Sequence, residues 1–291
     1  MLVYDGADMR IRTVDAGHLR LDGGAMFGVV PKPLWSKRTP VDDRNRITLA
    51  MRCLLVESES HRLLVDTGVG NKESEKFRDI YGIENAGQPT RLEDSLRAEG
   101  IDPTEITHVV NTHLHFDHAG GNTLVASDGS LLAAFPNATY VIRRGEWEFA
   151  HLDNERVRAS YISRNFDLLA DEGRVRFMDE DGDVVPGVRV VRTPGHTPYH
   201  QSVVVETVGG SFCYLADLVP TVAHLPLPWI MGYDVMPLDT LESKRSLLGR
   251  AAAEGWGLVF EHDPAIAWGR ALPREDGGEG CELADAVVDA V

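Results

Sequence analysis

A six-residue stretch in the middle of the chain, His113-Leu114-His115-Phe116-Asp117-His118, holds three imidazoles and a carboxylate directly after an apolar run. Imidazole nitrogen and carboxylate oxygen are the ligands of Zn²⁺ and its first-row neighbours, which need several such atoms converging on the ion. Alternate residues of an extended chain point to the same side, so His113 and His115 would face one ion. Asp117 and His118 diverge unless the chain turns there. The cluster therefore predicts a metal site, and two diverging pairs of ligands suit two ions.

The composition is that of an ordinary globular protein. The 291 residues are 43% hydrophobic and 25% charged, and no apolar run approaches the roughly 18 residues of a membrane span. The 45 acidic against 29 basic residues give a net charge of −16, which opposes a nucleic-acid partner because that affinity rests on Lys and Arg. We expect one domain over 1–291, with a core over about 9–271, no membrane span and a small-molecule substrate.

Cysteine usage and the first residues bear on the compartment. Cys53, Cys213 and Cys281 are odd in number and far apart, so they indicate neither a disulfide framework nor a CxxC site. Residues 1–8 carry acids where a secretory signal would carry basic residues, and no apolar segment follows them. Both observations favour a cytoplasmic protein.

Hydrophobic periodicity predicts many short strands and a few helices. The residues 21–31 are too glycine-rich for a regular element, and the acidic tail 272–291 is expected to be loosely held. Strands, helices and a strand in the first half are followed by strands and a helix in the second. This order favours an α/β fold, a four-layer αββα sandwich. The expected strands are 9–14, 47–57, 62–68, 106–110, 139–143, 175–178, 188–191, 201–206, 212–215 and 257–260, and the expected helices are 74–81, 91–98, 145–152, 154–169 and 240–254.

Further candidate ligands stand at strand ends downstream of the cluster. His196 lies in a Pro/Gly-bounded turn, Asp217 follows an apolar strand, and His262 follows another. Each alone is more often a cap or a surface residue, but the three together, in this order after the cluster, favour a metal centre. Asp66 at the end of the strand 62–68 is either a cap or an acceptor that orients a metal-bound imidazole.

Over roughly 11–271 the chain resembles the metallo-β-lactamase superfamily of metal-dependent hydrolases. The motifs that carry the resemblance are Val65-Asp66-Thr67-Gly68, the cluster itself, Pro194-Gly195-His196-Thr197, Ala216-Asp217 and Glu261-His262-Asp263. The resemblance implies one metal on His113, His115 and His196 and a second on Asp117, His118 and His262, with Asp217 and a hydroxide bridging them. It implies two divalent ions per chain, with zinc the first choice and iron, manganese or cobalt as alternatives.

Within the superfamily, the segment 196–202 is similar to the branch of acyl-homoserine lactone lactonases and methyl parathion hydrolase. This similarity implies opening of a lactone, or cleavage of a related carboxylic ester, by the bridging hydroxide, with Asp117 relaying a proton. Lactonases of the branch often carry a tyrosine three residues past the bridging aspartate, where this chain has Pro220. The donor to the substrate carbonyl would then be His224 or Tyr233. His200, like Asp66, is expected beside the ligands.

Substrate preference would come from apolar residues in Gly- and Pro-rich segments, which could instead close the edge of the sandwich or form a homodimer contact. Rival functions are a phosphotriesterase or arylesterase on the same site, a mononuclear iron sulfur dioxygenase and a nucleic-acid-processing enzyme. The complete second ligand set opposes the dioxygenase, and the acidic charge opposes the last. The predicted pocket residues are Met26, Phe27, Trp35, Trp229 and Met231.

Overall fold

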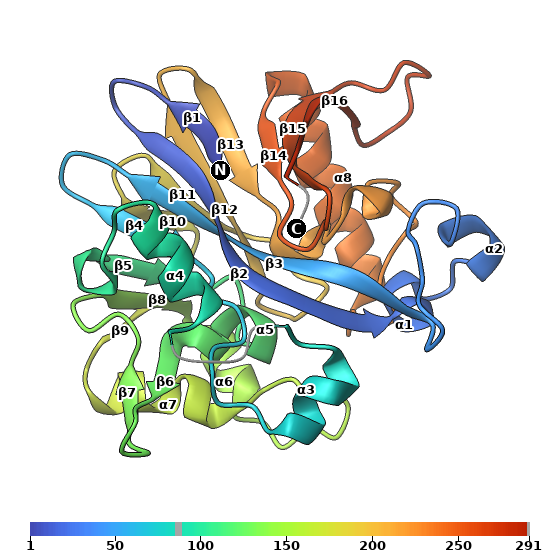
Figure 1. Cartoon of the computed structure of the whole chain (residues 1–291). Coiled ribbons are helices and arrows are strands. Elements are labelled where there is room, and N and C mark those ends of the chain that lie inside the picture. Colours follow the sequence, from blue (N-terminus) through green and yellow to red (C-terminus); the bar gives the residue numbers. More distant parts are fainter. Residues whose placement is uncertain (85–88, 290–291) are drawn as a thin grey trace. The chain divides into compact units, whose positions relative to one another are not determined.

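The computed structural model describes residues 1–84 and 89–289 (Figure 1). The contacts divide the chain into two compact units. The first unit is Met1–His18 with Met51–Val185, and the second unit is Leu19–Ala50 with Pro186–Val291. The organisation of 1–291 as a single domain stays a prediction. Among the helices of the described residues, none has the length and apolar character needed to cross a membrane.

One seven-stranded sheet has the strand order β1-β2-β3-β4-β5-β8-β9. The strands β3 and β4 form an antiparallel pair, while β4, β5, β8 and β9 run parallel to one another. A separate ribbon pairs β6 with β7. The strands are β1 (Leu2–Asp5), β2 (Arg10–Asp22), β3 (Arg46–Glu57), β4 (Arg62–Val65), β5 (His108–Val110), β6 (Thr123–Val125), β7 (Leu131–Ala133), β8 (Thr139–Arg143) and β9 (Val175–Met178).

The other seven-stranded sheet runs in chain order from β10 to β16. Within it, β13 and β14 are parallel, while β11 with β12, β12 with β13, β14 with β15 and β15 with β16 are antiparallel. The strands are β10 (Gly182–Val185), β11 (Val188–Arg192), β12 (Gln201–Thr207), β13 (Gly210–Tyr214), β14 (Gly257–Val259), β15 (Ile266–Leu272) and β16 (Glu282–Val288).

The helices follow their sequence signals. A capping box of Thr90 and Glu93 begins α4. Pro237 in the first turn and Gly255 at φ 67° bound α8. In Figure 1, α8 lies alongside β14 and β15, and its Leu248 packs into the apolar core of the second unit. The helices are α1 (Gly23–Phe27), α2 (Lys32–Trp35), α3 (Glu75–Tyr81), α4 (Arg91–Ala98), α5 (Phe116–Ala119), α6 (Arg144–Ala150), α7 (Asp167–Asp171) and α8 (Pro237–Glu254). Short 3₁₀ turns lie at Pro103–Glu105, Gly120–Asn122, Ser163–Asn165, Ala216–Leu218 and Val222–His224.

Three sequence predictions were wrong. The glycine-rich segment 21–31 contains α1, because Asp22 accepts a hydrogen bond from the Ala25 amide and caps the helix. Residues 154–169, expected to be helical, are mostly turns, with only Ser163–Asn165 and the start of α7 helical. Phe166 and Leu169 are buried. The tail is held by the pairing of β16 with β15; its last two residues, 290 and 291, lie outside the described residues.

Candidate metal centre

In the first unit, the cluster follows the carboxyl end of β5, which lies beside the carboxyl end of β4. β4 and β5 are parallel, with Val65 opposite Val110, so both chains leave the sheet at the same edge. The next residue, Asp66, is buried and has a φ of 56°, a left-handed conformation rare for a residue with a side chain. Its carboxylate accepts hydrogen bonds from the amide and the hydroxyl of Thr112, at 2.8 and 2.7 Å. Asp66 therefore holds the backbone directly before His113.

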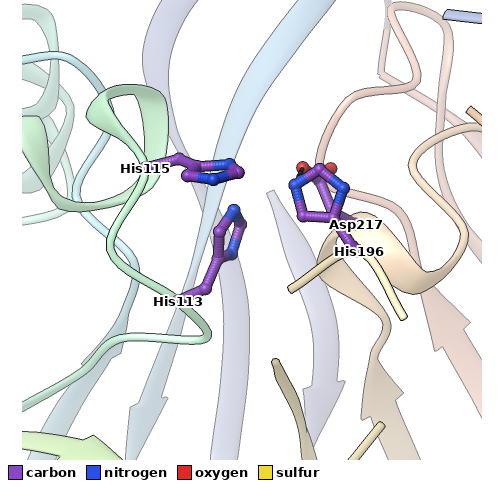
Figure 2. A group of neighbouring side chains, drawn as sticks. All are labelled: His113, His115, His196 and Asp217. Carbon is purple, nitrogen blue, oxygen red and sulfur yellow. Dashed lines mark ion pairs between the residues drawn. The ribbon is translucent and has the colours of Figure 1, made fainter. Parts of the chain in front are cut away.

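The same carboxylate orients a histidine of the cluster. Asp66 Oδ2 accepts a hydrogen bond from Nδ1 of His118 at 3.1 Å, so His118 Nε2 is the nitrogen available to a metal. The expected turn is α5, where the amide of His118 donates to the carbonyl of His115 at 3.1 Å. The ring of His113 lies 4.0 Å from that of His118 and 4.5 Å from that of His115, between centroids. Figure 2 shows His113 and His115 side by side.

A buried carboxylate that the sequence did not single out supports His115. The ring of His115 packs on that of Tyr161, with 4.7 Å between centroids. The hydroxyl of Tyr161 donates to Glu146 Oε1 at 2.8 Å, and the amide of Leu114 donates to the same oxygen at 3.1 Å. Glu146 lies on α6 and is 1% exposed. No local motif marks it, because its partners stand far from it in the sequence.

In the second unit, His196 lies in the turn that joins the antiparallel strands β11 and β12. Gly195 has a φ of 144°, and a Cβ atom there would stand 2.4 Å from the Thr240 amide nitrogen, so only glycine lets the turn approach α8. Nδ1 of His196 donates to Asp234 Oδ1 at 2.9 Å, and Asp234 Oδ2 accepts from the Thr240 hydroxyl at 2.8 Å. Asp234 is the other supporting carboxylate that sequence reasoning missed.

Asp217 faces two imidazoles of the second unit. β13 and β14 are parallel, with Tyr214 opposite Val259, so the residues that follow them emerge at one edge of the sheet. Asp217 Oδ2 lies 2.9 Å from His196 Nε2, and Asp217 Oδ1 lies 3.2 Å from His262 Nε2. His262 Nδ1 donates to the carbonyl of Ala50 at 2.7 Å, which fixes the ring orientation. One carboxylate thus directs an oxygen to each of two imidazole nitrogens.

The charge of this arrangement favours a cation. Burial opposes protonation of His196, yet Asp217 and Asp234 together raise its pKa to about 10. A neutral imidazole has one N–H, which here goes to Asp234, so Nε2 would present a lone pair to a carboxylate oxygen 2.9 Å away. Such a contact is stable only when a positive charge is shared there, either a second ring proton or a metal ion. The donor set therefore fits a divalent metal centre.

The predicted ligands are all buried. In the first unit, the ligand atoms of His113 and His115 lie within 4.8 Å of each other, and so do those of Asp117 and His118. In the second unit, the same holds for His196 and Asp217. The donors are imidazole nitrogens and carboxylate oxygens, as zinc and its neighbours require.

The donor candidates and His200 have different surroundings. His224 is buried, its Nε2 donates to the Met26 carbonyl at 2.8 Å, and its Nδ1 accepts from the Thr221 hydroxyl at 2.8 Å. Burial lowers the pKa of His224 to about 3, so the ring is neutral and would have to break a bond to donate to a substrate. Tyr233 is half-buried. His200 is buried, and its Nδ1 lies 2.9 Å from the Thr193 hydroxyl, within the turn that carries His196.

The residues predicted to line a pocket are largely core. Met26, Phe27 and Trp35 are at most 1% exposed, and Phe27 stacks on Trp35 with 5.1 Å between ring centroids. Met231 is also buried, whereas Trp229 is half-buried. This burial favours the alternative that most of these residues close the edge of the sandwich. Trp229 is the one of the five whose side chain is exposed enough to contact a substrate.

Comparison with known proteins places the chain in a family. Residues 51–262 match the model of the metallo-beta-lactamase superfamily, so the chain belongs to it, and the expected fold class is confirmed. An N-acyl homoserine lactonase of Bacillus cereus is 33% identical over 171 residues, which are 56% of this chain and 61% of that protein. The chain thus spans about three fifths of the length of the curated relatives it matches.

Two solved structures extend the likeness beyond that span. The crystal structure of a "probable metal-dependent hydrolase" from Staphylococcus aureus has a TM-score of 0.86 and 29% identity, and the match covers 98% of this chain and 100% of that chain. An N-acyl homoserine lactone hydrolase with N-hexanoyl-L-homoserine bound at its catalytic metal centre has a TM-score of 0.66 and 26% identity, covering 87% and 92%. The fold is therefore matched over nearly the whole chain.

Proposed function

We propose that the protein is a binuclear metal-dependent hydrolase that opens a lactone or cleaves a related carboxylic ester. The observation that carries the proposal is Asp217, whose two oxygens lie 2.9 Å from His196 Nε2 and 3.2 Å from His262 Nε2. A carboxylate that serves two imidazoles in this way suits a bridge between two metal ions. Membership of the superfamily and the burial of these His and Asp side chains support it.

The proposed ligand sets are those that the likeness to the superfamily implies. His113, His115 and His196 would hold one ion, and Asp117, His118 and His262 the other, with Asp217 shared. Three rings have Nδ1 bonded to an oxygen that fixes their orientation, namely Asp66, Asp234 or the Ala50 carbonyl. The metal-facing nitrogen of these rings is then Nε2. Zinc is the ion we favour, with iron, manganese and cobalt as alternatives.

When bound, the two ions supply Lewis acidity and lower the pKa of water from near 16 towards 7. The residues of this chain then hold and move protons. Asp117 is 7% exposed, and its carboxylate would accept the proton of the attacking water and pass it on after attack on the carbonyl. The donor to the substrate carbonyl is assigned to Tyr233 rather than His224, since both ring nitrogens of His224 have partners in the protein.

A lactone is the proposed substrate because the relatives at 31–33% identity are N-acyl homoserine lactonases. A homodimer and a cytoplasmic location remain predictions from the sequence.

The test measures metal content and hydrolysis on the same sample. Metal-loaded protein is assayed against lactones, aryl esters and phosphotriesters, before and after dialysis against a strong chelator. We expect close to two ions per chain, lactones as the best substrates and loss of hydrolysis with the metal. Phosphotriesters hydrolysed far faster than every lactone would replace the proposal with its rival. Full activity with one ion per chain would refute the binuclear centre.

A further inference from the structure

One side of helix α8 buries two polar side chains in the interior of the second unit. Thr240 and Lys244, one helical turn apart, lie on the same side of the helix and are 1% and 0% exposed. Thr240 bonds Asp234, the carboxylate that orients His196. A lysine wholly removed from water is uncommon, because its ammonium loses its hydration and must be solvated by the protein instead.

The ammonium of Lys244 is solvated by one short segment, residues 224–229. Its Nζ donates to the carbonyls of His224 at 2.6 Å, Pro226 at 2.9 Å and Trp229 at 2.9 Å. An ammonium has three N–H donors, so the three carbonyls match its capacity. Pro226 and Pro228 have no amide hydrogen, which limits the bonds that the segment can make with itself. The segment therefore depends on Lys244 for its shape.

Both ends of the 224–229 segment contact the same aromatic ring. The imidazole of His224 stacks on Phe27, with 4.5 Å between centroids and 2° between planes. Trp229 meets Phe27 edge-on at 5.8 Å, and the guanidinium of Arg38 lies 4.3 Å above the Trp229 ring. The position of Trp229 therefore follows from where the segment is tied.

In the sequence, the segment lies between two carboxylates that contact the same candidate ligand, His196. Asp217 precedes it and faces His196 Nε2, and Asp234 follows it and bonds His196 Nδ1. Burial lowers the pKa of Lys244 to about 7, against which the charge of Asp234 favours the ammonium form. The chain from 217 to 234 is thus anchored at both ends to one imidazole and in the middle to Lys244.

We propose that Lys244 is a positioning residue whose ammonium fixes the 224–229 segment and thereby places Trp229 as a substrate-contacting wall. It sets which acyl or alkyl groups are accepted, without holding the metal. The substrate part of this inference rests on the proposed function. The fixing of the segment by Lys244 does not rest on the proposed function, so either part of the inference can be refuted without the other.

Amide hydrogen exchange on metal-loaded protein tests the fixing of the segment. The Leu225 and Trp229 amides close turns onto the Val222 and Pro226 carbonyls, at 3.1 and 2.9 Å. In Lys244→Met these amides should exchange roughly tenfold faster or more, since three charge-assisted bonds are lost, while the amides of 116–119 keep their protection. Lys76→Met, the same substitution at an exposed lysine, is the control and should change neither. Unchanged exchange at 225 and 229 would overturn the proposal.

Kinetics and metal content test the consequence for substrate. In Lys244→Met, KM for lactones with long acyl chains should rise by roughly tenfold while kcat and metal content change little, because a wall is displaced and the ligands are not. Loss of metal in proportion to activity would show a merely structural lysine. If Lys244→Met does not fold, Pro228→Gly loosens the same segment at an exposed position and keeps the ammonium. Faster exchange there with unchanged chain-length selectivity would also overturn the role. If the wild-type protein cleaves no lactone, the proposed function fails while the exchange result still decides whether Lys244 fixes the segment.

Discussion

Asp217 and Asp234 bond the two nitrogens of one imidazole. Asp217 Oδ2 lies 2.9 Å from Nε2 of His196, and Asp234 Oδ1 lies 2.9 Å from Nδ1. The two carboxylates have different tasks, because Asp234 is tied to Thr240 on α8 whereas Asp217 also faces His262. Asp234 orients the ring, whereas Asp217 faces the ring nitrogen that would hold a metal ion.

Removing Asp234 should weaken metal binding without removing a ligand. In Asp234→Ala the affinity for the ion at His196 should fall by about 10- to 100-fold, since the ring loses the acceptor that fixes its orientation. Thr240→Val should have a smaller effect, because it only frees Asp234. Competition with a chromophoric chelator measures both, and Asp239→Ala, a neighbouring carboxylate on α8, is the control. Equal affinity in Asp234→Ala and wild type would refute the orienting role.

Because of the position of Asp217, we expect its substitution to remove more metal than the substitution of His262. Asp217→Asn should lower the content at both sites together, because one oxygen faces His196 and the other faces His262. His262→Ala should mainly empty one site, leaving close to one ion per chain. Metal stoichiometry of the purified variants checks this. The same loss in both variants would show that Asp217 does not bridge.

Burial of His224 makes stability depend on pH. Its pKa falls from 6.5 to about 3 on folding, so between these values the unfolded chain binds a proton that the folded protein does not. Stability is therefore full above pH 6.5 and is lost as the pH falls below it, by about 1.4 kcal/mol per pH unit. His224→Gln retains a donor for the Met26 carbonyl and does not titrate.

Urea unfolding of chelator-treated wild type and His224→Gln at pH 7.5 and pH 5 measures this difference. Wild type should lose about 2 kcal/mol more than the variant on acidification, since pH 5 lies 1.5 units below the unfolded pKa. Parallel losses in the two proteins would mean that His224 is protonated without cost.

Trp229 should make the enzyme favour longer lactone substituents. Each buried methylene is worth about 0.8 kcal/mol in transfer, and ordering of the chain offsets part of it, so we expect kcat/KM to rise roughly two- to threefold per methylene before a plateau. Trp229→Ala should flatten the series, because Met26, Phe27 and Trp35 are too buried to replace it. The measurement is kcat/KM of wild type and Trp229→Ala across a homologous lactone series. A value that does not change with chain length in wild type would show that these apolar residues only close the structure.

The sequence by itself determined what is local. Thr90 and Glu93 mark the start of α4, and short apolar runs mark β8 and β13. The His and Asp residues at strand ends were found because each follows an apolar strand. The cluster at 113–118, together with its family likeness, indicated the fold and the metal centre before any distance was known.

Only the tertiary structure decided which groups support the candidate ligands. Asp234 bonds His196, 38 positions away in the chain, and Glu146 accepts from the amide of Leu114, 32 positions away. Such pairings depend on strand order and helix packing rather than on spacing. Burial was decided in the same way. Met26, Phe27 and Trp35 belong to a glycine- and proline-rich stretch typical of a surface loop, yet all three are buried. The ring of Phe27 contacts Trp35, His224 and Trp229. A local pattern specifies direction and propensity, whereas contacts between distant residues arise only when the chain has folded.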